Sequence, residues 1–109
     1  MLEIVINGET VITFDKKRLP GHQRQFLDAM DLDMDEGIEL AGEYIAEPDE
    51  LQRAKYVAMS LFMAINSENA DMANAMCAYL VYRQPELKQV RVIENGMDIE
   101  LDLLYTEIN

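Results

Sequence analysis

Asn-Gly pairs near both ends of the chain constrain its fold more than any other feature. Asn7-Gly8 separates two β-branched runs at 2–6 and 10–14, and Asn95-Gly96 separates the runs 88–94 and 97–104. A type I′ turn needs positive φ at both central residues, which Asn and Gly tolerate better than other residues. We therefore expect a β-hairpin at each end of the chain.

The N-terminal hairpin has two possible registers. A two-residue loop pairs Ile4 with Val11, whereas a three-residue loop pairs Ile4 with Ile12 and Leu2 with Phe14. The second register gives the cleaner apolar face, so we favour it.

The C-terminal hairpin favours a two-residue turn at Asn95-Gly96. The resulting pairs are Val90 with Leu101, Val92 with Ile99, and Arg91 with Glu100. The apolar pairs then share one face and the charged pair lies on the other, and a slip of one residue would break all three matches. Apolar and acidic residues alternate along the last strand. We expect its apolar face to be buried; the residues on that face are Met97, Ile99, Leu101 and Leu103.

The middle of the chain has helical periodicity. A short helix is expected over 21–31, and the capping-box spacing of Asp33 and Glu36 predicts another over 34–46. Two clearer helices follow at about 48–66 and 68–83, the first with Pro48 at its first helical position, and their short joint predicts an antiparallel pair. An alanine-rich helix pair resembles one tetratricopeptide unit, but no second copy is present to cover its face.

The order of these elements predicts a single α+β domain over 1–109. The two hairpins would join into one four-stranded antiparallel sheet, with three to four helices on one face in the order ββ-α(α)αα-ββ. No β-α-β alternation occurs, which argues against a parallel sheet. The length suits one hydrophobic core.

The formal net charge of −12 narrows the class of partner. Such a surface repels nucleic-acid backbones and anionic membranes and attracts basic proteins or cations. We expect no direct nucleic-acid or membrane binding. With no basic, apolar leader at the N-terminus and no apolar run long enough to span a bilayer, a cytoplasmic location is expected.

Catalytic motifs are absent from the sequence. The lone His22 lies between Gly21 and Gln23, and no nucleophile triad, glycine-rich phosphate loop or Cys-x-x-Cys pair occurs. The single cysteine, Cys77, falls in an apolar helical pattern and is expected to be a buried hydrophobic residue. The basic residues Lys16, Lys17, Arg18 and Arg24 are expected to pair with the protein's own acidic surface.

A segment beginning at Asp31 resembles a calcium-binding loop only in part. Asp31, Asp33 and Asp35 take alternate positions, as the first oxygen ligands of an EF-hand do. The glycine required at the sixth position and the glutamate required at the twelfth each come one residue late, at Gly37 and Glu43. We therefore expect no metal site and no cofactor.

The same region predicts a docking surface. Ten carboxylates and no lysine or arginine lie between Asp28 and Leu51. If 34–46 is helical, four of them form one stripe, because they recur at spacings of three and four. This partner-binding stripe would consist of Glu36, Glu39, Glu43 and Glu47.

A homodimer is expected because the segments 56–65 and 75–82 are apolar almost all round their helices. A domain of this size cannot easily bury such helices completely. The side chains expected to form the dimer interface are Tyr56, Met59, Met63, Tyr79 and Tyr82.

Two classes of function remain open at the level of the sequence. The favoured one is a non-enzymatic acidic protein-interaction module, either an adaptor or chaperone or a nucleic-acid mimic that binds a basic protein. The alternative is an enzyme whose carboxylate and tyrosine site forms across the dimer interface. A deep cleft with convergent carboxylates would favour the enzyme.

Overall fold

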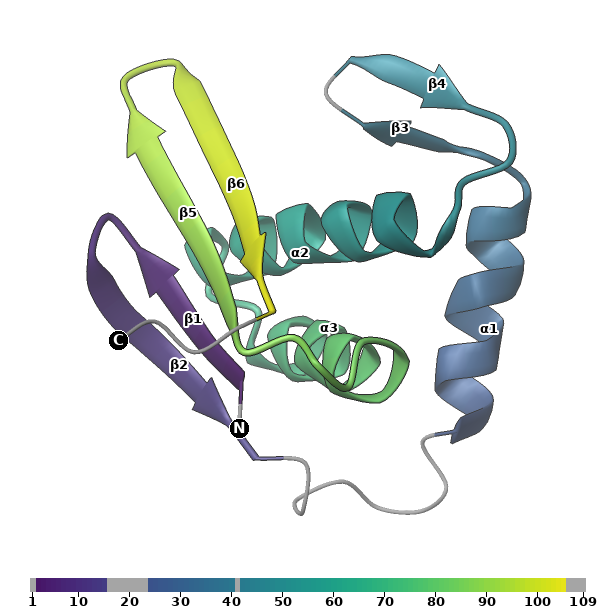
Figure 1. Ribbon diagram of the computed structural model, residues 1–109, viewed down its shortest axis with the longest axis horizontal. Helices are drawn as coiled ribbons and strands as arrows, with labels where there is room; N and C mark the ends of the chain where they lie inside the picture. The colour runs from purple at the N-terminus through teal and green to yellow at the C-terminus, as the bar shows by residue number, and fades with distance from the viewer. Residues whose placement is uncertain (1, 16–23, 41, 106–109) are drawn as a thin grey trace.

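The computed structural model describes residues 2–15, 24–40 and 42–105 (Figure 1). The helices are α1 (Arg24–Asp35), α2 (Glu50–Asn66) and α3 (Ala70–Arg83). The strands are β1 (Leu2–Ile6), β2 (Glu9–Phe14), β3 (Ile38–Leu40), β4 (Glu43–Ile45), β5 (Gln89–Asn95) and β6 (Asp98–Leu104).

The two terminal hairpins form one four-stranded sheet with the order β2-β1-β5-β6. The α+β class is confirmed, but the expected antiparallel sheet is wrong because the central strands β1 and β5 are parallel. Gln89, at the start of β5, lies beside Glu3 near the start of β1. The helices carry the chain back to the end of the sheet where β1 begins, and such a long crossover permits parallel pairing.

The N-terminal hairpin combines both registers that its sequence allows. Leu2 pairs with Phe14 and Ile4 with Ile12, as predicted. Nearer the turn, a bulge at Val11 restores a two-residue loop, in which Asn7 and Gly8 have φ of 51° and 82°. The bulge lets the hairpin keep both its apolar pairs and its preferred Asn-Gly turn.

The C-terminal hairpin differs from its predicted register by two residues. Val90 pairs with Leu103 and Val92 with Leu101, so the turn lies at Gly96-Met97. A two-residue shift preserves the face of every side chain, which is why the apolar pairing survives. Met97, however, is 100% exposed and Ile99 is 43% exposed, so the prediction that both are buried is wrong.

The predicted helix over 21–31 is confirmed from Arg24 onward, residues 21–23 lying outside the described part of the chain. The predicted helix over 34–46 is wrong, because the end of α1 and the strands β3 and β4 take its place. The described part of α1 continues through Asp35, and Gly37 then takes a φ of 108° before β3 begins. Strands β3 and β4 pair with Ile38 opposite Ile45. The expected cap at Asp33 is therefore wrong, because Asp33 lies within α1.

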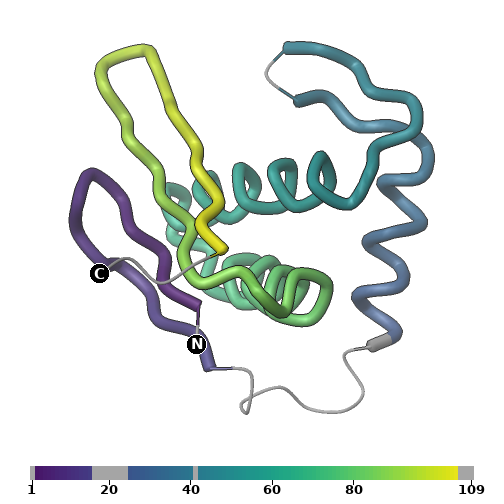
Figure 2. The backbone as a smooth tube through the Cα atoms, viewed as in Figure 1, coloured from purple at the N-terminus to yellow at the C-terminus, as the bar shows by residue number. Residues whose placement is uncertain are grey.

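The later helices follow their predictions closely. Helix α2 begins after Asp49, whose side chain forms a capping box with Gln52, so Pro48 lies just outside the helix and not at its first position. Asn69 caps α3 in a similar way by accepting a hydrogen bond from the backbone of Met72. Residues 84–88 then connect α3 to β5, with no helix or strand between them (Figure 2).

The hydrophobic core lies between the sheet and the α2–α3 pair. Side chains that are almost fully buried include Ile4 and Val92 from the sheet and Leu61 and Leu80 from the helices. Cys77 is also fully buried, as predicted. Helix α1 lies across the N-terminal end of α2 and the C-terminal end of α3, away from the sheet (Figure 1).

Candidate functional site

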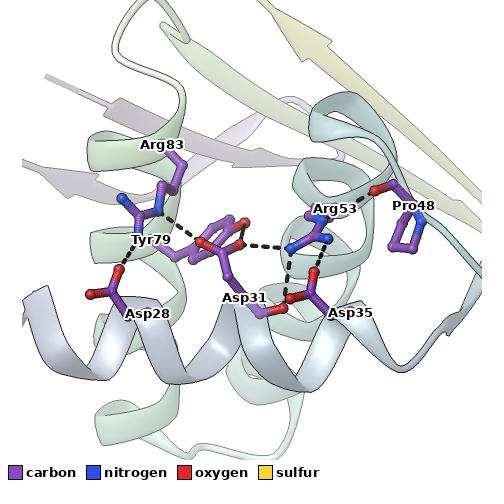
Figure 3. Close-up of polar contacts among 7 residues, drawn as sticks. All are labelled: Asp28, Asp31, Asp35, Pro48, Arg53, Tyr79 and Arg83. Carbon is purple, nitrogen blue, oxygen red and sulfur yellow. Dashed lines mark hydrogen bonds and ion pairs between the residues drawn. The ribbon is translucent and has the colours of Figure 1, made fainter.

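Asp31, on α1, is the centre of a polar cluster that joins all three helices (Figure 3). Its Oδ1 accepts hydrogen bonds from the Tyr79 hydroxyl at 2.6 Å and from Arg53 Nη1 at 3.2 Å. Its Oδ2 accepts from Arg83 Nε at 3.0 Å. One carboxylate therefore connects α1 to α2 through Arg53 and to α3 through Tyr79 and Arg83.

Both arginines also contact a second carboxylate of α1. Arg83 Nη2 donates to Asp28 Oδ1 at 2.6 Å, and Arg53 forms an ion pair with Asp35. The backbone carbonyl of Pro48 accepts a further hydrogen bond from Arg53 Nε at 3.2 Å. We call Asp28, Asp31, Asp35, Arg53, Tyr79 and Arg83 the helix clamp.

The helix clamp could have been found from the sequence in part. Asp28, Asp31 and Asp35 are spaced by three and four residues, so a continuous helix places them on one face. Because the sequence pattern predicts separate helices over 21–31 and 34–46, it does not place Asp35 on the same helix as Asp28 and Asp31. No local sequence pattern links these aspartates to the two arginines, because Arg53 and Arg83 lie 22 and 52 positions from Asp31.

The clamp borders an open pocket of about 520 Å³. Its lining adds Pro48, Asp49, Glu50 and Gln84 to four of the clamp residues. Burial, and secondarily the hydrogen bond to Asp31, raises the pKa of Tyr79, so this hydroxyl stays protonated at neutral pH. The hydrogen bond with Asp35 raises the pKa of Arg53, which keeps its positive charge. These groups are fixed donors that are already paired within the protein.

The pocket is a poor site for an anion. Arg53 and Arg83 are offset by the three aspartates of α1, and Asp49 and Glu50 add two more carboxylates to the lining. In the parts of the chain that the structure describes, no group of three or more His, Cys, Asp or Glu side chains is arranged to hold a metal ion. The clamp geometry therefore fits a structural role that positions α1.

Comparisons with protein-family models, curated proteins and solved structures found no match. The shape and charge of the surface are therefore the basis for a functional assignment.

The four glutamates predicted to bind a partner are all exposed, but they do not form a helical stripe. Glu36 follows α1, Glu39 lies in β3, Glu43 lies in β4 and Glu47 precedes α2. Glu39 is paired with Tyr44 and Glu43 with Leu40, so these two glutamates point to opposite faces of the β3–β4 hairpin. The predicted stripe is wrong because this segment is extended and not helical.

Four of the five predicted dimer residues retain solvent-exposed surface, and one is buried. Tyr56, Met59 and Met63 lie on one side of α2, at positions separated by three and four residues, and Met63 is 62% exposed. Tyr82, on α3, is 41% exposed. Tyr79, by contrast, is 3% exposed and belongs to the helix clamp, so it has almost no surface to offer a second copy.

A second acidic surface lies on β6, at one edge of the sheet. Asp98, Glu100 and Asp102 are exposed and alternate along the strand, so they share the face opposite the helices. None of these three carboxylates forms an ion pair with a residue that the structure describes. We call them the β6 carboxylates. The alternation is visible in the sequence, but the position of β6 at an edge is not.

Other sequence features lie partly or wholly beyond the described residues. His22 and the basic residues Lys16, Lys17 and Arg18 are outside them, and of Arg24 only the backbone at the start of α1 is described. No helix within the described ranges is long and apolar enough to cross a membrane.

Proposed function

We propose that this protein is a non-enzymatic interaction module whose partner presents a basic surface. The observation that supports the proposal is the distribution of its charges. Arg53 and Arg83 form ion pairs with aspartates inside the helix clamp. The β6 carboxylates and the glutamates of the β3–β4 hairpin instead face solvent. A surface with unpaired carboxylates on two projecting hairpins attracts cationic partners over a long range.

The pocket geometry supports a binding role over a catalytic one. An acid–base catalyst needs a titratable group that can reach the substrate and exchange a proton near neutral pH. Tyr79 and the two arginines of the pocket are instead held in hydrogen bonds to aspartates and keep their protons. An adaptor, a chaperone and a nucleic-acid mimic in the cytoplasm are all compatible with this proposal.

We also propose that the chain forms a homodimer through the side of α2 that carries the half-buried Tyr56 and Met59 and the exposed Met63. Unpaired apolar helix faces are typical of interfaces. A mass of 12.5 kDa in light scattering at tens of micromolar would contradict the dimer. A mass near twice that value, which falls to the monomer value in M63E, would support it.

The proposed function is tested by capture on the immobilised chain from a lysate of the source organism, at low and at high salt. Proteins with basic surfaces are expected to be retained at low salt and released at high salt, because screening weakens exposed ion pairs. An absence of any salt-sensitive captured protein would contradict the proposal. For a captured partner, the E39Q/E43Q variant tests whether the β3–β4 hairpin takes part, since it keeps side-chain shape and removes two charges.

A further inference from the structure

We propose that β6 is a docking edge for an extended basic segment of the partner, which would bind as an additional strand of the sheet. This inference rests on the proposed function and specifies the surface and the conformation of the ligand. Addition of a strand to an open sheet edge uses main-chain hydrogen bonds for affinity and alternate side chains for specificity.

The first argument is the regularity of this edge. Strand β6 pairs with β5 on one side, and no described strand lies on its other side (Figure 1). Its seven residues, Asp98–Leu104, are paired without a bulge, so its free side presents an uninterrupted row of backbone N–H and C=O groups.

The opposite edge of the sheet is built differently. Strand β2 is interrupted by the bulge at Val11, which changes the register between Ile4 and Val5. Bulges twist an edge strand and prevent further pairing. Of the two edges, β6 is therefore the one whose geometry suits an incoming strand.

The second argument is the chemistry of the two faces of β6. The β6 carboxylates occupy alternate positions on the outer face, roughly 6.7 Å apart. On the inner face, Ile99 is 43% exposed and Leu101 and Leu103 are half-buried. An added strand that alternates basic and apolar residues would match both faces with the same spacing.

The same charges argue against a second copy of this chain as the occupant. Antiparallel pairing of two β6 strands across a two-fold axis would bring carboxylates into opposing or diagonal positions on one face. Like charges opposite each other on neighbouring strands are destabilising. A basic partner strand replaces this repulsion with attraction, so the edge is selective for a heterologous ligand.

The experiment uses the full chain and a synthetic peptide in which lysine and valine alternate. A control peptide of identical composition gathers its lysines at one end, and a second control carries N-methyl groups on alternate backbone nitrogens. We expect the alternating peptide to bind more tightly than both controls and to slow hydrogen exchange at backbone amides of β6. Equal binding of the three peptides, or protection confined to other elements, would overturn the inference.

Two matched variants then locate the charges that matter. D98N/E100Q/D102N removes the β6 carboxylates, and E39Q/E43Q/E47Q removes three carboxylates from the β3–β4 hairpin and the loop after it. The first variant is expected to weaken peptide binding roughly tenfold, because three exposed ion pairs are lost, and the second less than about threefold.

The outcomes separate the two proposals. If both variants bind the peptide equally weakly while circular dichroism shows an intact fold, the binding is a general electrostatic attraction. That result would overturn docking at β6. A failure of the wild-type chain to bind any of the basic peptides at low salt would overturn both the docking edge and the proposed function.

Discussion

Asp31 of α1 and Tyr79 of α3 are joined by a hydrogen bond of 2.6 Å across 48 positions of sequence. The Tyr79 ring is buried, while the Asp31 side chain is 28% exposed and also accepts from two arginines. This arrangement attaches α1 to the N-terminal end of α2 and the C-terminal end of α3, away from the sheet. The helix clamp thus holds the element that leads into the acidic β3–β4 hairpin.

Replacement of Asp31 by Asn should lower the free energy of unfolding by about 2 kcal/mol. The change removes the negative charge of the carboxylate that accepts hydrogen bonds from Tyr79, Arg53 and Arg83. Hydrogen bonds to charged groups contribute roughly 1.5 to 3 kcal/mol each to stability. Urea unfolding of D31N measures the loss. The control is D33N, which makes the same charge change on an exposed residue of α1 and should stay within about 0.5 kcal/mol of wild type. Equal stability of the two variants would mean that the clamp contributes nothing.

The stability of the protein should fall as the pH rises above 9. Burial raises the pKa of Cys77 from its ordinary value of 9.0 to about 12. Between these values the unfolded chain loses the thiol proton and the folded chain keeps it, so each pH unit costs at most about 1.4 kcal/mol. The burial of Tyr79 adds to the decline above pH 10. Urea midpoints of wild type and C77A, measured from pH 7 to the alkaline limit, should converge as the pH rises. Parallel pH profiles would contradict the assignment.

Gly37→Ala should destabilise the protein more than Gly42→Ala. Gly37 has a φ of 108°, and an added Cβ would overlap the Tyr44 side chain, whose hydroxyl donates to the Glu36 carbonyl at 3.0 Å. Gly42 has a φ of 79° but nothing within 4 Å of an added Cβ. Both variants carry the cost of positive φ, about 1 kcal/mol or more, and G37A adds the steric overlap and a φ farther from the left-handed region that alanine can adopt. Thermal unfolding compares the two, and similar losses would show that Tyr44 moves aside without cost.

The two Asn-Gly pairs should respond differently to substitution. Asn7 has a φ of 51°, and its Oδ1 accepts from the Glu94 backbone N–H at 2.8 Å. Asn7→Ala should therefore cost about 2 kcal/mol, half from the positive φ and half from the lost hydrogen bond, whereas Asn7→Gly should lose only the second part. Asn95 lies in β5, opposite Asp98 and before the turn, so Asn95→Ala should be nearly neutral. Chemical denaturation of the three variants would contradict the structure if N95A and N7A lost the same stability.

Local signals in the sequence determined the positions of both terminal hairpins, the faces of their strands and the two long helices. Turn residues with positive φ, period-two alternation and helix caps act within a few residues, so they specify these elements without knowledge of the rest of the chain. The acidic character of the surface was likewise readable from composition.

Tertiary structure decided what depends on partners far along the chain. The parallel pairing of β1 with β5 follows from the path of the helices, and the two-residue slip of the C-terminal hairpin was invisible because it leaves every side chain on its original face. Strands β3 and β4 pair with each other, with Ile38 buried against the core, although the spacing of their residues also suits a helix. The helix clamp needs Asp31 to meet arginines 22 and 52 positions away. Such contacts are selected by packing of the whole chain, which the local pattern does not encode.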